Sequence, residues 1–200
     1  DDISAGLDTP LADRRGLAGC IPLFKVAGAA AEEGKSLDEV YEIAEKFNSR
    51  IATLAVAMTG CTHPQNGQPI TELGDDEMEI GMGQHGEGGG GRSKILTADE
   101  TAKIMFGDLA KAVLLKSGEK IFVAVNGVGA TTPMELSIVF RAVKNLASEM
   151  GVEVVGGLVD ELLTVQEMAG FQLIVCVVDE QSEKYLYAKS NAPYWTSLGE

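Results

Sequence analysis

One histidine in this sequence stands in a setting that suits chemistry. His85 lies in the run Gly81-Met82-Gly83-Gln84-His85-Gly86-Glu87, which continues as Gly88–Gly91. A neutral imidazole acts as a nucleophile or a base near pH 7. Glycines beside it remove side-chain bulk and permit unusual backbone angles, so a small molecule can approach the ring closely. We predict a functional site at His85, lined by Gly83 and Gly86. A surface-loop histidine without a chemical role is the alternative.

Carboxylates flank this histidine and allow two roles. Glu79 and Glu87 are placed to orient the imidazole or to move protons. The wider acidic group could instead bind a hard cation through oxygen ligands; its members are Asp75, Asp76, Glu77, Glu79 and Glu87. The sequence has no EF-hand spacing, no His-x-x-Glu pattern and no paired cysteines typical of zinc. We therefore expect a solvated acidic edge and no metal site.

Three further features resemble functional motifs only in part. His63 precedes a proline and is expected to be a turn residue, and Cys61 lacks a catalytic pattern and is expected to be structural. The stretch Asn126–Thr132 lies between a predicted strand and a predicted helix, and Asp160 follows the next strand, which imitates a dinucleotide fingerprint. Thr132 occupies the third glycine position, so the motif supports nicotinamide binding only weakly. A helix N-terminus there can still hold a phosphate or a polar substrate group.

Composition restricts the class of partner. The chain has 200 residues, of which 45% are apolar, a net charge of −14 and a pI near 4.5. One domain with a sizeable core is expected, and neither nucleic acid nor an anionic membrane is an expected partner, because both need a positive surface. No apolar run approaches the roughly 18 residues of a membrane helix, and we expect no signal peptide. Three widely spaced cysteines predict reduced thiols in the cytoplasm.

The hydrophobic pattern predicts an α/β fold. Helices are expected from Gly16 to Gly34, after a capping box at Ser36, after a capping box at Thr97, at 133–150 and, as a short helix or turn, after Asp179. Strands are expected at 53–59, 78–83, 121–125, 152–158 and 173–178, the last one covered on both faces. The segment 121–158 therefore predicts a strand–helix–strand unit.

The same periodicity predicts which side chains face the core. The helix after Ser36 should bury Leu37, Val40, Tyr41, Ala44 and Phe47. The helix after Thr97 should bury Ile104, Met105, Leu109, Ala112 and Val113. In the strand at 78–83, Met78, Ile80 and Met82 should face the core, and Glu79, Gly81 and Gly83 should face outward.

Several long motifs, in order along the chain, resemble the second half of the dihydroxyacetone kinase substrate-binding subunit. The resemblance covers nearly the whole chain and rests on Arg14–Gly19, Gly28–Ala31, Cys61-Thr62, Pro64, Gly67, Pro69, Glu77–Gly83 with His85-Gly86-Glu87, Asn126, Gly129–Thr131 with Glu135-Leu136, Met168–Phe171 and Asn191–Pro193. It implies the mixed-sheet α/β fold of that subunit's second domain. Residues 1–13 would be a connector from a missing N-terminal half, and residues 14–200 a single domain.

The resemblance also implies a reaction. In the family, the histidine of the Gly-x-His-Gly-Glu motif, here His85, attacks the ketone carbon of dihydroxyacetone and forms a covalent hemiaminal. Glycerol lacks a carbonyl and is excluded by reactivity. A donor in another domain or subunit, either ATP with magnesium or a phosphoprotein, phosphorylates the held substrate. This chain itself is expected to bind no cofactor. The implied partners are the short ketose, the missing half and the donor, in a homodimer or hetero-oligomer.

Departures from the family pattern leave alternatives open. The first half, with its Gly-His-Glu-Pro loop and an aspartate base, is absent, so this chain alone is expected to be catalytically incomplete. Gly88–Gly91 replaces the usual Pro-Gly-Ile and predicts a looser loop, and Val165-Gln166 and Thr132-Pro133 also depart from the pattern. Another short ketose, such as a four-carbon one, is therefore an alternative substrate. A non-catalytic regulator that senses the ketone on the same scaffold is the second hypothesis.

Overall fold

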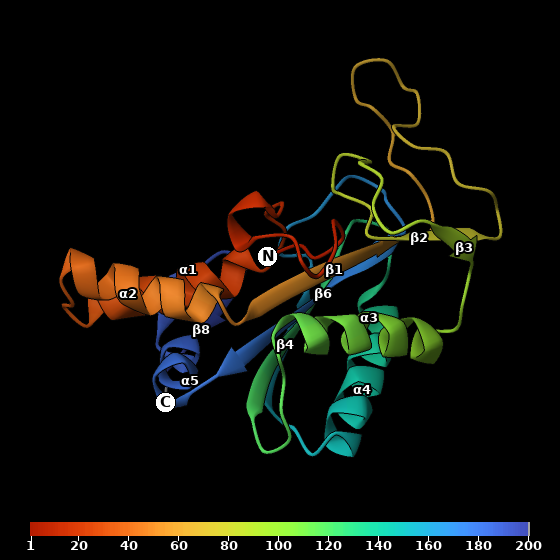
Figure 1. Cartoon of the computed structure of the whole chain (residues 1–200). Helices are drawn as coiled ribbons and strands as arrows, with labels where there is room; N and C mark the ends of the chain where they lie inside the picture. Colours follow the sequence, from red (N-terminus) through yellow and green to blue (C-terminus); the bar gives the residue numbers. More distant parts are fainter. Residues whose placement is uncertain (200) are drawn as a thin grey trace.

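The computed structural model describes residues 1–199, and its central element is a six-stranded mixed sheet (Figure 1). The strand order is β3-β2-β1-β6-β4-β5, with β1 (Ile51–Ala57), β2 (Glu77–Ile80), β3 (Arg92–Lys94), β4 (Lys120–Gly127), β5 (Glu153–Asp160) and β6 (Gly170–Val178). β1 is antiparallel to β2 and β6, and β4 is antiparallel to β6 but parallel to β5. Two short strands, β7 (Ser190–Ala192) and β8 (Trp195–Ser197), form a separate hairpin. The predicted mixed-sheet α/β class is confirmed.

Helices cover both faces of the sheet (Figure 1). One layer contains α1 (Cys20–Glu32), α2 (Leu37–Asn48) and α5 (Glu180–Tyr187); the other contains α3 (Ala98–Ala112) and α4 (Pro133–Glu149). A short 3-10 helix, η1 (Leu11–Asp13), precedes α1. The parallel pair β4 and β5 is joined by α4, so the predicted strand–helix–strand unit is confirmed.

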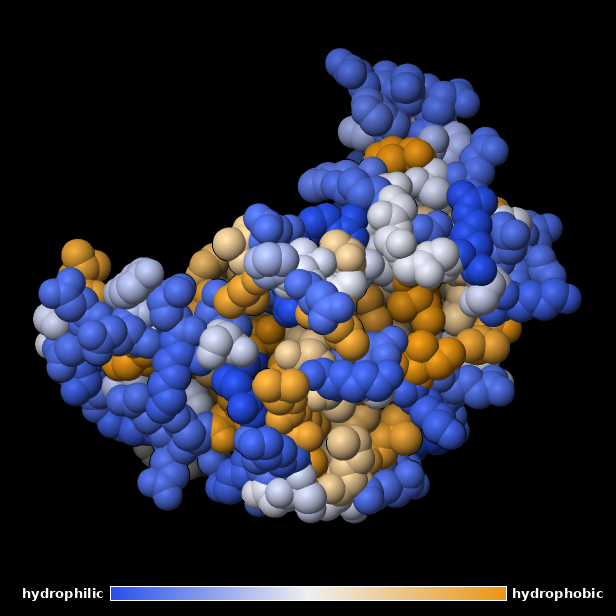
Figure 2. Space-filling view, viewed as in Figure 1, coloured by the Kyte–Doolittle hydropathy of each residue, from blue (hydrophilic) through white to orange (hydrophobic). Residues whose placement is uncertain are grey.

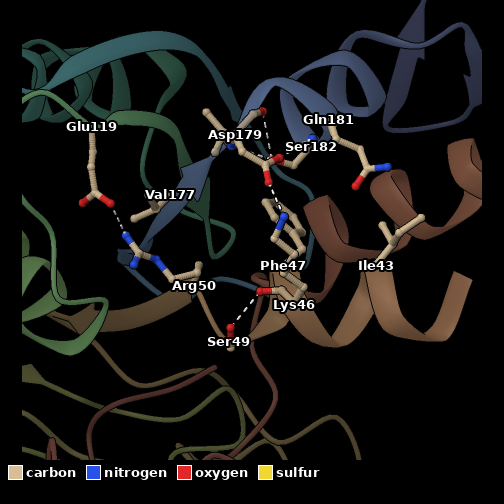
Figure 3. A pocket seen from close by; sticks show the side chains of 11 residues that line it. Ile43, Lys46, Phe47, Ser49, Arg50, Glu119, Val177, Asp179, Gln181 and Ser182 are labelled. Atoms are coloured by element: carbon tan, nitrogen blue, oxygen red, sulfur yellow. Dashed lines mark hydrogen bonds and ion pairs between the residues drawn. The ribbon is translucent and has the colours of Figure 1, made fainter. Parts of the chain in front are cut away.

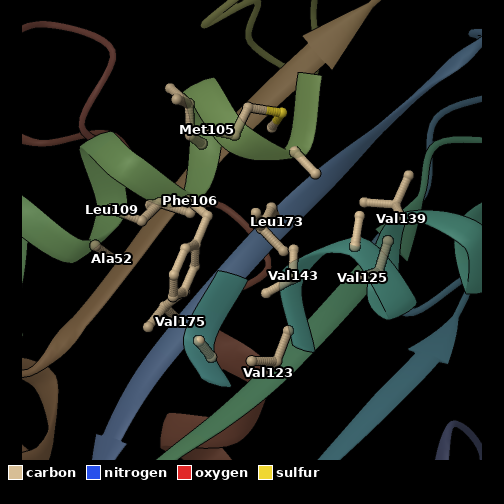
Figure 4. Close-up of a cluster of buried hydrophobic side chains, with 14 of the residues drawn as sticks. Ala52, Met105, Phe106, Leu109, Val123, Val125, Val139, Val143, Leu173 and Val175 are labelled. Carbon is tan, nitrogen blue, oxygen red and sulfur yellow. The ribbon is translucent and has the colours of Figure 1, made fainter. Parts of the chain in front are cut away.

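Alternate residues of the central strands supply two cores. In β6, Leu173 belongs to the cluster beneath α3 and α4, whereas Ile174 belongs to the cluster beneath α1, α2 and α5. Every residue of β6 is buried, as expected for a strand with helices on both faces. Figure 4 shows the first cluster, in which Phe106 of α3 and Val143 of α4 pack over the strands. The sheet is therefore a rigid support for the loops at its ends.

Capping boxes fix the starts of four helices. Ser36, Thr97, Thr132 and Asp179 each accept a hydrogen bond from the backbone N–H three residues later, and the side chain there bonds back to the cap. This arrangement satisfies backbone groups that a helix start leaves without partners. The capping boxes predicted at Ser36 and Thr97 are both confirmed.

The first helix begins later than its sequence predicts. α1 starts at Cys20 instead of near Gly16. The reason is that the backbone N–H groups of Leu17 and Gly19 each donate to the Asp1 carboxylate at 3.0 Å, which holds this stretch in a non-helical turn. Pro22 lies in the first helical turn as expected, where its missing N–H costs no helical hydrogen bond.

Three large apolar side chains predicted to be buried are exposed. Leu37 and Tyr41 of α2 are 84% and 64% exposed, and Ile104 of α3 is 43% exposed. Each helix meets the sheet along a narrower stripe than the sequence pattern implies. On α2 the stripe runs through Val40 and the buried Phe47, and the flanking apolar positions face solvent.

The outer face of β2 also differs from expectation. Met78 and Met82 are buried as predicted, each 1% exposed. Glu79, Gly81 and Gly83 are buried too, although the alternating pattern predicts that they face outward. Alternation fails here because the chain following β2 folds back over the face that would otherwise meet solvent.

The first residues of the chain pack into the domain. The backbone N–H of Ile3 donates to the Thr53 carbonyl at 3.0 Å, and the N–H of Thr53 donates to the Asp1 carbonyl at 2.9 Å. Asp2 thus lies beside β1 as a short parallel partner, and Ile3 is only 5% exposed. Residues 1–3 therefore extend the pairing along β1.

A hydrophilic projection rises above the body of the molecule. Figure 2 shows it at the top of the view, and Figure 1 shows that it is formed by the segment between β1 and β2.

Within residues 1–199 no helix combines the length and the apolar character needed to cross a bilayer.

Candidate functional site

The loop that carries His85, residues 81–91, joins β2 to β3 and is here named the His85 loop. Its first part is attached to the sheet, because the backbone N–H of Gly81 donates to the Ala55 carbonyl at 2.7 Å. Met82 follows and packs with Ala57 and Met168 in a small third core. His85 therefore emerges three residues after a buried anchor, at the end of the sheet where β1 ends.

A carboxylate holds the imidazole of His85. Nδ1 lies 3.1 Å from Oε1 of Glu87, and the backbone N–H of His85 donates to Oε2 of Glu87 at 2.9 Å. An ionised carboxylate only accepts hydrogen bonds, so this contact favours a ring hydrogen on Nδ1, and in the neutral ring Nε2 then keeps its lone pair. The ring is 83% exposed. The arrangement thus exposes the imidazole at the surface of this domain.

The same hydrogen bonds keep Glu87 ionised. Partial burial acts to raise the pKa of Glu87, but the backbone N–H groups of Glu87 and His85, together with the His85 ring, lower that pKa below its ordinary value. Glu87 is consequently a carboxylate throughout the neutral range and can serve as the partner of Nδ1.

The glycines predicted to line a pocket allow neighbouring groups to come close. A Cβ atom at Gly83 would collide with Oε2 of Glu87 and with Nη1 of Arg15. A Cβ atom at Gly86 would lie 2.5 Å from Oγ1 of Thr71, which donates to the Gly86 carbonyl at 3.0 Å. The structure brings Gly83, Gly86 and Glu87 together around His85, and the two glycines permit the tight loop that holds the ring.

Glu79 supports the His85 loop from below. It is 6% exposed, and its Oε1 accepts the backbone N–H of Gly89 at 2.9 Å, while Oε2 lies 3.5 Å from Nε of Arg92. The N–H of Gly90 donates to the Ile80 carbonyl at 2.7 Å. The glycine run is therefore fastened to β2 at two points, and the looser loop expected from Gly88–Gly91 is not found at these two residues. Among the hydrogen bonds of residues 1–199 Glu79 has no contact with the imidazole; its partners are the Gly89 backbone and Arg92.

Two other acidic residues of this region form ion pairs. Glu77 lies 3.8 Å from Arg92, and Asp76 lies 3.9 Å from Lys94. Within residues 1–199 no group of three or more His, Cys, Asp or Glu side chains is arranged to hold a metal ion. Glu77 and Asp76 thus have arginine or lysine partners within the domain.

His63 and Cys61 have the structural roles that the sequence indicates. Nδ1 of His63 accepts the backbone N–H of Gln65 at 3.2 Å, which closes a turn in the projecting segment. Cys61 is 2% exposed in the third core, and burial, with a smaller effect of Glu167, raises the pKa of its thiol. A protonated buried thiol is a poor nucleophile.

Residues of the segment 161–168 pack closely against the glycines of the loop after β4. A Cβ atom at Gly129 would collide with the Gln166 carbonyl, and one at Gly127 would collide with the Glu161 side chain. The segment 161–168 therefore occupies the space beside these glycines that a pyrophosphate would need. This packing argues against the nicotinamide hypothesis.

A hollow of about 360 Å³ lies at the opposite end of β1, between α2 and α5 (Figure 3). Its charged side chains are paired with one another: Lys46 with Asp179 at 2.6 Å, and Arg50 with Glu119 at 2.7 Å. The pairs neutralise the lining, so this hollow offers less chemistry than the exposed imidazole.

Arg15 is a residue of the site that sequence reasoning missed. Its guanidinium donates to the Gly81 carbonyl at 2.7 Å and, over a longer distance of 3.5 Å, to the Glu87 carbonyl. The sequence gives no local signal for these contacts, because the partners lie more than sixty positions away along the chain. Thr71 was missed for a similar reason.

Fold and site together define a class: a mixed α/β domain that presents one imidazole, held by a carboxylate, on a glycine loop at a sheet end. Residues 1–194 match the family model described as the Dak1 domain. The chain belongs to this family, that of the dihydroxyacetone kinases, and the recognition made from sequence motifs is confirmed.

Individual relatives support the assignment. The chain is 40% identical over 181 residues to the dihydroxyacetone-binding subunit of PTS-dependent dihydroxyacetone kinase 1 of Listeria innocua, which covers 90% of this chain and 55% of that subunit. It is 40% identical over 197 residues to the L-erythrulose kinase of Pectobacterium atrosepticum, covering 96% of this chain and 33% of that enzyme. A solved structure, the dihydroxyacetone kinase operon co-activator Dha-DhaQ, superimposes with a TM-score of 0.89 at 32% identity and covers 98% of this chain and 61% of that one. The chain thus spans about half the length of the first relative and a third of the second.

Proposed function

We propose that this domain captures a short ketose covalently on Nε2 of His85, as the substrate-holding part of a ketose kinase. The observation that carries the proposal is the contact between Nδ1 of His85 and Glu87, which leaves Nε2 with a lone pair on an 83% exposed ring. A carbonyl carbon is the electrophile that such a nitrogen attacks reversibly.

The step balances without an added reactant. The Nε2 lone pair forms a bond to the carbonyl carbon, and the carbon–oxygen π pair moves to oxygen. The ring would become cationic, so its Nδ1 proton passes to the carboxylate of Glu87, and a proton from solvent reaches the new alkoxide. The product is a neutral hemiaminal, and the Glu87 proton returns to solvent. Glu87 thus positions the ring and accepts the proton that the reaction releases.

Phosphoryl transfer needs groups beyond this domain. The imidazole is exposed, and catalysis of phosphoryl transfer depends on a positioned nucleophile and an environment that excludes water. We therefore assign the acid–base residues, the remaining wall of the site and the phosphoryl donor to partner domains or subunits. This domain alone is expected to bind the ketose and not to phosphorylate it.

Two lengths of ketose fit the proposal. One relative is named for dihydroxyacetone and another for L-erythrulose, which have three and four carbons. Both compounds present a ketone flanked by a hydroxymethyl group, so both can form the same hemiaminal. The sequence departures at Val165-Gln166 lie outside the His85 loop and give no reason to prefer one of them.

Carbon-13 NMR tests the capture directly. Dihydroxyacetone labelled at C2 should lose its ketone signal and gain a protein-bound signal of a tetrahedral carbon when mixed with the domain. His85→Ala should abolish the bound signal, and His63→Ala, the matched control, should leave it intact. L-Erythrulose labelled in the same way compares the two substrates. A bound tetrahedral signal that survives in His85→Ala refutes the role of His85.

A ketose-sensing regulator is the second candidate function. It is favoured by the similarity to the operon co-activator, which extends over 98% of this chain. Such a protein would form the same hemiaminal without phosphorylating the ketose. Measuring ketose phosphate formation in the complete protein with its donor separates the two: product supports the kinase, and adduct without product supports the regulator.

A further inference from the structure

One arginine joins the beginning of the chain to the His85 loop. Nε of Arg15 forms an ion pair with Oδ2 of Asp2 at 2.7 Å, and Nη2 donates to Oγ of Ser4. On its other side the guanidinium donates to the carbonyls of Gly81 and Glu87. Asp2 is 1% exposed, so the ion pair is anchored in the interior of the domain.

The contacts on the loop side bracket the histidine. The Gly81 carbonyl precedes His85 by four positions and the Glu87 carbonyl follows it by two, so both stems of the turn meet the same guanidinium. The Glu87 carbonyl also accepts the backbone N–H of Gly83 at 2.7 Å, which closes the turn. A side chain at Gly83 would collide with Arg15, so the guanidinium packs directly against the loop backbone.

We infer that Arg15 is a positioning residue for His85. It fixes the turn that places Glu87 against Nδ1, and it ties that turn to the buried Asp2 and to Ser4. A planar guanidinium can serve these partners at once, because its donors point in fixed, divergent directions; a lysine ammonium is a compact point charge and cannot reproduce the pattern. Arg15 acts on the proposed ketose capture only through His85, and the inference rests on that proposed function for its effect on the adduct.

The Arg15 guanidinium links residues 1–4 with the His85 loop. Residues 1–4 lie along β1, and the His85 loop follows β2, so Arg15 couples the sheet edge to the imidazole. A shift of residues 1–4 would reach the ring through the Arg15 side chain. The geometry therefore makes His85 sensitive to whatever engages the segment that contains Asp2.

Arg14 supplies a matched control. Its guanidinium donates to the carbonyls of Thr9 and Leu7, within the N-terminal segment and away from the His85 loop. Arg14→Ala removes the same charge and a side chain of the same size one position away. Any effect of net charge alone should be equal in the two alanine variants.

The experiment compares Arg15→Ala, Arg15→Lys, Arg14→Ala and the unchanged chain by two readouts. Long-range proton–nitrogen NMR reports the ring tautomer of His85; the chain has two histidines, and His63→Ala identifies the signals. The second readout is occupancy of the labelled dihydroxyacetone adduct. Arg15→Lys keeps an ion pair with Asp2 and provides a folded variant if Arg15→Ala unfolds.

We expect the unchanged chain and Arg14→Ala to show the Nδ1–H tautomer. Arg15→Lys should show a mixture of tautomers and roughly tenfold lower adduct occupancy, the loss expected for one charge-assisted hydrogen bond. A merely structural role would lower the unfolding temperature and leave the ring spectrum of the folded protein unchanged, and that result overturns the inference. If no variant and not even the unchanged chain forms an adduct, the proposed function fails, while a changed ring spectrum in Arg15→Lys still supports the positioning role.

Discussion

Glu87 binds His85 at two points, with Oε1 3.1 Å from the ring Nδ1 and Oε2 2.9 Å from the backbone nitrogen. One carboxylate thus sets the position of the residue and the orientation of its ring. A carboxylate partner on one ring nitrogen fixes the tautomer and leaves the other nitrogen for chemistry. The intervening Gly86 has a φ of +81°, a left-handed backbone angle that glycine adopts readily.

Replacing Glu87 by glutamine should weaken ketose capture. Glutamine has nearly the same shape but carries no charge, so it neither holds the Nδ1–H as strongly nor accepts the proton released on hemiaminal formation. We expect roughly tenfold lower adduct occupancy at a fixed dihydroxyacetone concentration, consistent with the loss of one charged hydrogen bond. The measurement is the intensity of the tetrahedral carbon signal across a ketose titration.

Glu72→Gln is the control for this change, because Glu72 is exposed, lies before β2 and outside the His85 loop, and its replacement removes the same charge. Its adduct occupancy should equal that of the unchanged chain. Equal occupancy in Glu87→Gln and Glu72→Gln contradicts the assigned role of Glu87.

Alanine substitutions at two glycines of the His85 loop distinguish the cost of backbone strain from the cost of steric crowding. Gly81 and Gly91 have nearly equal positive φ angles, +93° and +97°. A Cβ atom at Gly81 would lie 2.6 Å from the Gly90 nitrogen and 2.9 Å from Cβ of Ser4, whereas a Cβ atom at Gly91 meets nothing within 4 Å. Gly91→Ala should therefore destabilise folding by about 1–2 kcal/mol, the cost of the left-handed angle.

Gly81→Ala should cost about 1–3 kcal/mol more, because a tightly packed backbone must move to admit the methyl group. Chemical denaturation of both variants gives the two free energies of unfolding. Equal destabilisation would mean that the loop yields freely, and the description of a loop fastened to β2 would then be wrong.

Local patterns in the sequence predicted much of the fold. The capping boxes at Ser36 and Thr97, the all-apolar strand from Leu173 and the parallel strand–helix–strand unit depend on residues close together along the chain. The predicted burial of Leu37 and Tyr41 was wrong, because periodicity defines the apolar side of a helix but not the width of the stripe that the sheet covers. That width depends on how the helix lies against its neighbours.

In the candidate site, too, the sequence predicted the local contact and missed the contacts between distant segments. His85 and Glu87 are two positions apart and their contact follows from a local motif. The alternating pattern of β2 predicted that the Glu79 side chain faces solvent. It is buried because the chain after β2 folds back and places Gly89 beside it, and an alternating pattern carries no information about such a fold. Arg15 gave no signal as a site residue, since its contacts with Gly81 and Glu87 connect segments far apart in sequence.

Removing the Glu79 carboxylate should loosen the His85 loop. Glu79→Ala leaves the Gly89 N–H and the Arg92 guanidinium without this acceptor, and the loss of a typical hydrogen bond costs about 0.5–1.5 kcal/mol. Glu79→Gln retains one acceptor oxygen and should cost less. Urea unfolding gives the stability, and amide hydrogen exchange at Gly89 and Gly90 gives the local opening.

Glu77→Ala is the control, because the Glu77 side chain is 41% exposed and the contacts that it loses are an exposed hydrogen bond from the Gly74 N–H and the 3.8 Å pairing with Arg92, neither of which is made with the His85 loop. Surface pairs of this kind contribute little, so its stability should change by less than about 0.5 kcal/mol. If Glu79→Ala behaves like Glu77→Ala in both measurements, Glu79 does not support the loop.

The N-cap of α5 should make the stability of the opposite end of the sheet depend on acid. Burial acts to raise the pKa of Asp179, but hydrogen bonds from Lys46 and from the backbone and side chain of Ser182 lower it to about 2. A carboxyl whose pKa is depressed in the folded state stabilises it above the unfolded value of 3.8, and this contribution is lost as the pH falls from 3.8 to about 2.

Asp179→Ala should therefore lower the free energy of unfolding by about 1 kcal/mol at pH 7, the usual value of an N-cap. Asp179→Asn keeps a capping oxygen and loses only the half-exposed pair with Lys46, so it should cost less. The difference in stability between Asp179→Ala and the unchanged chain, here called the gap, should narrow as the pH falls from 4 toward 2, because the Asp179 carboxylate of the unchanged chain is then protonated. Amide hydrogen exchange along α5, followed down to the lowest pH at which both proteins stay folded, measures the gap locally. A gap that stays constant over this range would show that the carboxylate charge of Asp179 does not hold the helix start.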